Sequence, residues 1–256
     1  MRYHPVYEEQ MYRPGVREYF AHQNYYNYGY WESDTPDQGV ACRNLVDKLL
    51  EFLPEKRGRL LEVACGLGGT TANLSESFGP HEVVAIDLSA RNVRNARIAA
   101  PGCSGAIMDA AELGVGDEKV DNVVSVEAAF HFVTRELFFA ESFRVLKPGG
   151  RLVLSDILFR RVRNRFLPAA NFVADLGAYE ALLRRAGFRE VRVIDATEAC
   201  WGGFRRNLRR WGWRTFRSTR SSVAASLRVR RIVGLVLWLG GLRLALRHYL
   251  LVVATK

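Results

Sequence analysis

Hydrophobic and polar positions follow two different periods along this chain. Seven short apolar runs rich in branched side chains predict β-strands at 60–64, 82–87, 105–108, 120–126, 151–155, 189–194 and 248–253. Helical spacing predicts helices at 37–53, 70–78, 89–100, 134–146 and 172–187. Strands that alternate with helices of about 10–15 residues form parallel sheets through βαβ crossovers. The pattern therefore predicts an α/β protein with a doubly wound, mainly parallel sheet.

The two ends of the chain depart from this alternation. Residues 1–35 are rich in tyrosine without a clean period, and we expect them to form a lid segment. Residues 197–247 have helical spacing and predict an insertion that caps the acceptor site or an interface. We assign residues 36–196 to the core, and 248–256 to its final strand, which we expect to be antiparallel because it closely follows a helical segment.

The distribution of charge along the chain sets one segment apart from the rest. A chain of 256 residues with 48% hydrophobic and 25% charged residues is globular, which excludes disordered, collagen-like and disulfide-rich classes. The net charge is +10, yet residues 184–231 alone hold 14 arginines against three acidic residues. The excess positive charge therefore belongs to one late segment.

Cysteine spacing and hydropathy further limit the class of protein to which the chain can belong. The four cysteines are scattered without a Cys-x-x-Cys pair, so we expect neither a metal site nor a disulfide framework. The beginning of the chain has no apolar signal core. The longest apolar run, 232–242, has 11 residues, whereas a membrane span needs about 20. We expect a cytoplasmic protein without a membrane span, and contact with a membrane surface stays open.

A glycine-rich turn joins the first predicted strand to its helix, with the sequence Glu-Val-Ala-Cys-Gly-Leu-Gly-Gly over 62–69. Glycines let the backbone approach a ligand, and the helix offers free N–H groups, although the turn could serve packing alone. Asp87 and Asp109 end the next two strands. Parallel sheets bind ligands at the edge where these strand ends meet, and a carboxylate at Asp87 could accept both hydroxyls of a ribose.

The segment after the fourth strand carries the best candidate for a catalytic base. It reads Glu-Ala-Ala-Phe-His-Phe over 127–132, and an imidazole at His131 suits proton transfer because its unperturbed pKa is about 6.5. Asp156 ends the fifth strand, which neighbours the fourth in such a fold, and could orient His131 or bind the substrate. The alternative is that both residues only cap or pack their turns.

Together these motifs resemble class I S-adenosylmethionine-dependent methyltransferases over residues 59–156. The resemblance rests on the glycine loop, the acid that ends the second strand, the Asp109-Ala110 pair and the sequence Leu-Lys-Pro-Gly-Gly over 146–150. It implies a Rossmann-like, seven-stranded sheet and S-adenosylmethionine as cofactor. A dinucleotide enzyme is disfavoured because Thr71 takes the last position of a Gly-x-Gly-x-x-Gly pattern.

The resemblance also implies a role for each of these positions. Glu62 would orient the loop and the methionine amino group, Gly66 and Gly68 would make room for the methionine, and Asp87 would bind the ribose. Ala64 stands where the family usually has glycine. The remaining cofactor contacts that we expect are Leu88, Asp109 and Ala110 near the adenine, Glu127, and the lid residues Tyr28 and Tyr30.

Four segments narrow the resemblance to bacterial secondary-metabolite O-methyltransferases of the microcystin and phenolphthiotriol type: 24–31, 63–66, 127–132 and 154–157. This implies O-methylation of a sizeable, partly apolar small molecule in natural-product biosynthesis, with His131 and Asp156 as base and partner. Carbon or nitrogen methylation of a similar scaffold stays open, as does a non-catalytic cofactor-binding module.

An RNA methyltransferase is the competing interpretation of the arginine-rich segment. Arginines would hold phosphates, and Trp201, Trp211 and Trp213 would stack on bases. The spacing also fits a solvated helix face or a contact with anionic lipid or an acidic substrate. The Asn/Asp-Pro-Pro-aromatic turn typical of base-amine methylation does not follow the fourth strand. We therefore do not expect a nucleic acid partner, and a homo-oligomer stays open.

Overall fold

A computed structural model describes residues 9–160, 167–218 and 246–256. One seven-stranded sheet has the order β3-β2-β1-β4-β5-β7-β6. Its strands are β1 (Leu60–Val63), β2 (Val83–Asp87), β3 (Ser104–Ile107), β4 (Val120–Val126), β5 (Leu146–Phe159), β6 (Glu190–Asp195) and β7 (Leu246–Thr255). Strands β1 to β5 run parallel, and β7 pairs antiparallel with both β5 and β6. The predicted fold class and its antiparallel last strand are confirmed.

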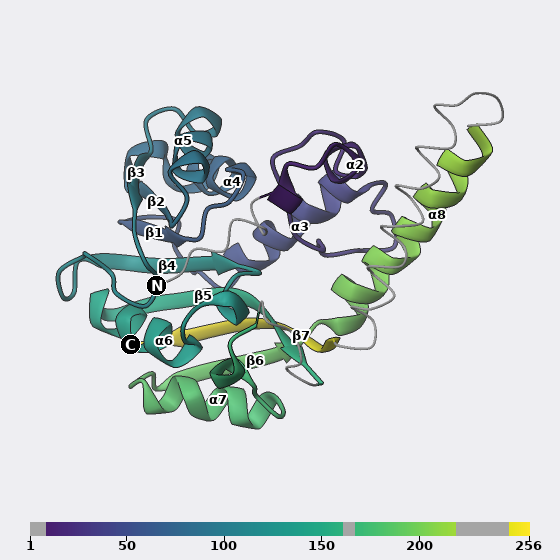
Figure 1. Ribbon diagram of the computed structural model, residues 1–256. Helices are drawn as coiled ribbons and strands as arrows, with labels where there is room; N and C mark the ends of the chain where they lie inside the picture. Colours follow the sequence, from purple (N-terminus) through teal and green to yellow (C-terminus); the bar gives the residue numbers. More distant parts are fainter. Residues whose placement is uncertain (1–8, 161–166, 219–245) are drawn as a thin grey trace.

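Helices cover both faces of this sheet (Figure 1). They are α2 (Pro14–Tyr19), α3 (Gln38–Leu50), α4 (Gly69–Phe78), α5 (Ala90–Ala99), α6 (Arg135–Val145), α7 (Leu176–Arg185) and α8 (Gly203–Ser218). Successive strand residues enter opposite cores: Leu60 packs with α3 and α4, whereas Leu61 packs with α6 and α7. Because both faces are buried, the strands are continuous apolar runs rather than alternating ones.

Polar side chains fix where the helices begin. The Asp37 carboxylate accepts a hydrogen bond from the N–H of Val40 at 3.0 Å, and Ser89 and Thr134 cap α5 and α6 in the same way. The prediction for the fifth of these helices started at residue 172, but α7 starts at Leu176 because Asp175 is its cap. An N-cap satisfies backbone N–H groups that have no partner within the helix.

Strand β5 is longer than predicted. The sequence suggested a turn over 148–150 before a strand at 151–155, but β5 begins at Leu146 and continues to Phe159. Its register against β4 shifts, so that Leu146 pairs with Val120 and Arg151 with Asn122. The Pro-Gly-Gly segment is therefore an irregularity inside the paired strand, and β5 extends further because β7 pairs with it as far as Phe159.

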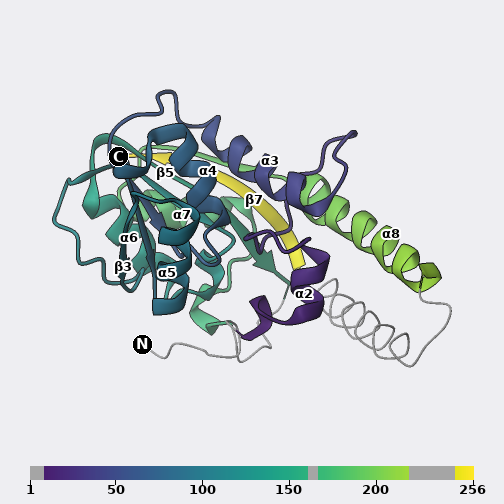
Figure 2. The ribbon, with the colours of Figure 1, turned by 90° about the horizontal axis from the view of Figure 1, so that it is seen from above.

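The insertion before the last strand begins with a π-helix, Glu198–Gly202, which continues into α8. Helix α8 extends away from the sheet in both views (Figures 1 and 2). The predicted helical character is confirmed over 198–218, and the rest of that insertion, 219–245, lies outside the described residues. Among the described residues no helix is long and apolar enough to cross a membrane.

Candidate active site

Three successive strand ends meet at the carboxyl edge of the sheet. The Asp87 carboxylate at the end of β2 accepts hydrogen bonds from the N–H of Gly66 at 3.0 Å and of Ser89 at 2.9 Å. The N–H of Met108, just after β3, donates to the Asp87 carbonyl at 3.1 Å. The glycine loop, Asp87 and the segment after β3 are thereby brought together, as the sequence suggested.

Glu62 on β1 carries a buried carboxyl group. Its side chain is 2% exposed, and within the described part of the chain its Oε2 atom has no hydrogen-bond partner. Burial, with a smaller contribution from the negative charge of Asp87, raises the pKa of Glu62 to about 8. A buried carboxyl of this kind favours a cationic donor, since hydrogen bonding and opposite charge offset the cost of desolvation.

The loop needs small residues at several positions, and the structural reason differs from one position to the next. At Gly66, φ is +54° and no atom lies within 4 Å of the position that a Cβ would occupy. At Gly68, φ is +90° and a Cβ would lie 2.8 Å from the Cα of Ala96 on α5, so this glycine allows close packing of α4 on α5. Ala64 also adopts a left-handed φ of +66°, which explains why glycine suits that position. Gly66, not Gly68, faces open space.

These observations fit the cofactor that the sequence resemblance implies. The Oε2 atom of Glu62 offers a buried acceptor for an ammonium group, and a Cβ at Gly66 would have no atom within 4 Å, which leaves room for a ligand in the loop. Further along the edge, Leu88 is partly buried, Ala110 is buried, and Asp109 accepts from the N–H of Ala111 at 2.9 Å. Within the described ranges no group of three potential ligands could hold a metal ion.

The N-terminal segment crosses this edge, and three of its hydrogen bonds reach α5, α4 and the loop after β4. The hydroxyl of Tyr12 donates to Asn92 on α5 at 3.1 Å. The carbonyl of Asn24 accepts from the N–H of Gly69, the first residue of α4, at 2.8 Å. The N–H of Tyr28 donates to the Glu127 carboxylate at 2.6 Å. These bonds hold the segment across the strand ends, and its function as a lid stays a prediction.

Glu127 joins the lid to the last strand. Its Oε1 atom accepts from the N–H of Tyr28 and from the hydroxyl of Tyr249 on β7, both at 2.6 Å. Burial raises the pKa of Glu127 to about 8. The ring of Tyr28 packs on those of Trp201 and Phe204, with centroids 5.0 and 4.7 Å away. Tyr28 and Glu127 therefore belong to one cluster.

Tyr30 lies outside the cluster of Tyr28 and Glu127 and contacts α3. Its N–H donates to the carbonyl of Ala41 on α3 at 2.8 Å, and Lys48 of the same helix lies over its ring at 5.5 Å from the centroid. These contacts fix the N-terminal segment to α3 and agree with the packing alternative for Tyr30, whose contact with the cofactor stays a prediction.

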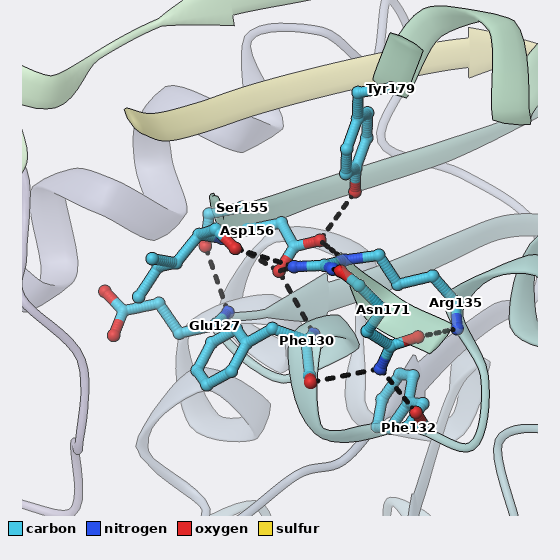
Figure 3. A network of polar contacts seen from close by, with 9 residues as sticks. Glu127, Phe130, Phe132, Arg135, Ser155, Asp156, Asn171 and Tyr179 are labelled. Atoms are coloured by element: carbon cyan, nitrogen blue, oxygen red, sulfur yellow. Dashed lines mark hydrogen bonds and ion pairs between the residues drawn. The ribbon is translucent and has the colours of Figure 1, made fainter. Parts of the chain in front are cut away.

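Asp156 lies at the centre of a buried polar network (Figure 3). Its side chain is 0% exposed, and Oδ2 accepts from Arg135 Nε at 2.7 Å and from the hydroxyl of Tyr179 at 2.8 Å. Oδ1 accepts from the N–H of Phe130 at 3.1 Å and of Ile157 at 2.8 Å. A carboxylate with this many hydrogen bonds is placed to position other groups, which agrees with the alternative that Asp156 orients the His131 loop; its role as catalytic partner of His131 stays a prediction.

The same network fixes the loop that carries His131. Asn171 donates from its amide nitrogen to the carbonyls of Phe130 at 3.1 Å and Phe132 at 2.6 Å. Its amide oxygen accepts from the N–H of Arg135 at 2.8 Å. The backbone is therefore bonded on both sides of His131, whose ring packs against that of Phe130 with centroids 4.1 Å apart. The side chain of Glu127 points away from this network (Figure 3).

Sequence reasoning missed four residues of this region: Arg135, Asn171, Tyr179 and Tyr249. Arg135 is the first residue of α6 and looks like an ordinary surface arginine in the sequence. The only available signal was that an acid at a strand end inside the apolar run 152–159 needs a partner, because buried charges are almost always paired.

Two buried carboxyl groups should make the free energy of unfolding of the cofactor-free protein depend on pH. Glu62 and Glu127 both have folded-state pKa values of about 8, whereas the unfolded chain releases these protons near pH 4.3. Between these values the folded state binds more protons, so the free energy of unfolding should fall as pH rises from about 5 to 8. Each group contributes at most about 1.4 kcal/mol per pH unit.

Urea unfolding at several pH values would measure this slope. Glu62→Gln and Glu127→Gln should each flatten it, and a slope unchanged by both variants would contradict the assignment. The carboxyls with lowered pKa values titrate below this window and do not interfere: Asp121, Glu141 and Asp195.

Comparison with known proteins agrees with this geometry. Residues 61–154 match the family model of a methyltransferase domain. The O-methyltransferase cnsE of Penicillium expansum is 28% identical over 195 residues, 68% of each chain. The erythromycin 3''-O-methyltransferase of Saccharopolyspora erythraea is 31% identical over 66% of this chain and 63% of its own length. A phosphoethanolamine N-methyltransferase of Arabidopsis thaliana is 30% identical over 68% of this chain and 38% of its own.

Solved structures share the fold over nearly the whole chain. The cyclase SpnF superposes with a TM-score of 0.72 at 20% identity, covering 98% of this chain and 94% of its own. A geranyl diphosphate methyltransferase gives a TM-score of 0.70 at 16% identity, covering 98% and 97%. At such identities the likeness concerns the fold alone.

Proposed function

Because the chain belongs to the class I S-adenosylmethionine-dependent methyltransferases, we propose that it methylates a hydroxyl group of a partly apolar secondary metabolite, with His131 as general base. The observation that carries this proposal is the position of His131. It lies in the loop after β4, at the edge where Glu62, Gly66 and Asp87 converge, and its backbone is bonded on both sides. Two of the relatives are named as O-methyltransferases.

S-adenosylmethionine supplies a methyl group that is already activated on a sulfonium. The protein therefore needs to orient the acceptor, remove its proton and exclude water. His131 would take the hydroxyl proton on an imidazole nitrogen. Glu62 would bind the methionine ammonium group and Asp87 the ribose. The N-terminal segment, fixed by Asn24 and Tyr28, would exclude water from this edge.

Apolar side chains next to His131 support a partly apolar acceptor. Val133 is 47%, Leu137 50% and Phe172 49% exposed. Val133 and Leu137 lie just beyond His131 in the chain, and Phe172 follows Asn171, which bonds to the same loop. Exposed apolar side chains near a catalytic group commonly form a ligand or partner contact.

The acceptor class can be tested directly. Incubation with isotopically methyl-labelled cofactor and a small-molecule extract of the source organism should give a labelled methyl ether, identified by mass spectrometry and by its O-methyl resonance. Label on nitrogen or carbon would replace the proposed hydroxyl acceptor, and label in RNA alone would overturn the small-molecule proposal.

Asp87→Ala should weaken S-adenosylmethionine binding by roughly 10- to 100-fold, since a hydrogen bond to a charged group is worth about 1.5–3 kcal/mol. Isothermal calorimetry would measure the change. Asp117→Ala is the matched control, because that side chain is 75% exposed and pairs with Arg144 away from the strand ends. Equal affinities for the two variants would contradict a role for Asp87 in cofactor binding.

A further inference from the structure

Helix α8 has one face packed on the core. Phe204 and Leu208 are buried, and the Tyr19 ring packs edge-on against Phe204 and Trp211 with centroids 5.6 and 5.3 Å away. The amide of Asn207 donates to the Tyr19 hydroxyl at 3.1 Å. These contacts fix the orientation of α8 relative to α2, so its other face has a defined direction.

The opposite face is an exposed stripe with helical spacing, made of Arg206, Arg209, Arg210, Trp213 and Arg214. Trp213 is 57% exposed. In its 16 residues α8 contains six arginines and no acidic residue. The stripe is therefore a strongly positive surface with one aromatic side chain among its charges.

Two exposed arginines on other helices have an acidic partner on the same helix, although α5 carries Arg91, Arg94 and Arg97 without an acidic residue. Arg43 pairs with Asp47 on α3 and Arg184 with Glu180 on α7, both four residues apart. On α8 this spacing brings Arg206 close to Arg210 and Arg210 close to Arg214, and like charges four residues apart weaken a helix. Arg206 also pairs with Glu198 in the preceding π-helix. Helix α8 differs from α5, the other described helix with arginines and no acidic residue, in its six arginines and in the exposed Trp213 among them.

We propose that this stripe docks on an anionic lipid surface. A basic helix face with an exposed tryptophan suits the headgroup region of a bilayer, where arginines meet lipid phosphates and the indole enters the interface. Helix α8 is about 24 Å long and reaches away from the sheet, so the stripe can lie flat on such a surface (Figures 1 and 2).

The structure disfavours nucleic acid as the partner. Base stacking would need the tryptophans that the sequence offered, but Trp201 is 5% exposed and stacked on Phe204, and Trp211 packs on Tyr19. Only Trp213 of the three remains on the exposed stripe. Single-strand binding relies on several exposed aromatic side chains in series. This docking proposal does not depend on which acceptor the enzyme methylates.

Vesicle co-sedimentation tests the proposal with the full chain. Wild-type protein should bind vesicles of phosphatidylglycerol and phosphatidylcholine much more tightly than vesicles of phosphatidylcholine alone, and salt should weaken the binding. The triple variant Arg209→Gln/Arg210→Gln/Arg214→Gln should lower the partition coefficient roughly 100-fold, because each arginine near an anionic surface is worth about 1 kcal/mol. Trp213→Ala should weaken partition without changing the salt dependence.

The matched control removes three exposed arginines from other surfaces, Arg94→Gln/Arg97→Gln/Arg189→Gln. Both triple variants lower the net charge of +10 by the same amount, and circular dichroism would verify that both fold. Retained binding in the control supports a docking surface on α8. An equal loss in both variants, no preference for anionic vesicles, or tighter binding of single-stranded RNA that the α8 variant alone abolishes would overturn it.

Discussion

His131→Ala is expected to lower kcat by roughly 10²- to 10⁴-fold while S-adenosylmethionine affinity stays close to that of the wild type. The imidazole is the group that we propose to remove the acceptor proton. The groups that fit the cofactor, Glu62, Gly66 and Asp87, lie at the ends of β1 and β2 and do not contact the His131 loop in the described bonds. Loss of the base should therefore affect the chemical step and spare binding.

Single-turnover kinetics with the acceptor found by labelling, together with calorimetry, would separate these effects. The control is His81→Ala, because His81 is exposed and lies between α4 and β2, away from the β4 loop. Undiminished turnover in His131→Ala would exclude His131 as the base. A parallel fall in cofactor affinity would instead indicate that the substitution disturbs the edge of the sheet.

Asp156→Ala is expected to destabilise the protein by about 3–5 kcal/mol, the typical result of removing one partner from a buried ion pair. Both Asp156 and Arg135 are almost fully buried, with side-chain exposures of 0% and 3%. The variant would remove the carboxylate partner of the Arg135 guanidinium, which also donates to the carbonyls of Asn171 and Ile157, and the acceptor of the Tyr179 hydroxyl. Urea denaturation with extrapolation to water would measure the change.

Two further variants identify the cause of that loss. Asp117→Ala breaks an exposed pair with Arg144 and should cost less than about 1 kcal/mol. Arg135→Met/Asp156→Leu removes both buried charges and should be more stable than Asp156→Ala, since no unpaired charge remains. A double variant less stable than Asp156→Ala would show that the pair itself, and not the uncompensated charge, accounts for the stability.

The network also connects stability to activity. Asp156 accepts a hydrogen bond from the N–H of Phe130, and Arg135 and Asn171 bond to each other. These bonds hold the loop around His131 in its position. Asp156 is a positioning residue in this arrangement. Its replacement should lower kcat through misplacement of His131, without the direct loss of a proton acceptor that His131→Ala causes.

Much of the fold could be predicted because its signals are local. Except for β5, every strand lies within two residues of its predicted bounds, since β-branched runs between turn residues are visible in the sequence. Helix starts at 38, 90 and 135 followed from the capping residues Asp37, Ser89 and Thr134. The extra length of β5 could not be predicted, because residues 156–159 pair with β7, about a hundred residues later in the chain, and Leu146 pairs with Val120 on β4.

The sequence by itself determined the α/β fold, the glycine loop followed by Asp87 and Asp109, and the concentration of arginine in one late segment. Only the tertiary structure decided what individual side chains do. It placed Gly68 against α5 and Tyr30 against α3, and it buried Asp156 beneath Arg135 and Tyr179. The physical reason is that secondary structure follows from the spacing of neighbouring residues, whereas burial and hydrogen-bond partners depend on segments far apart in the chain.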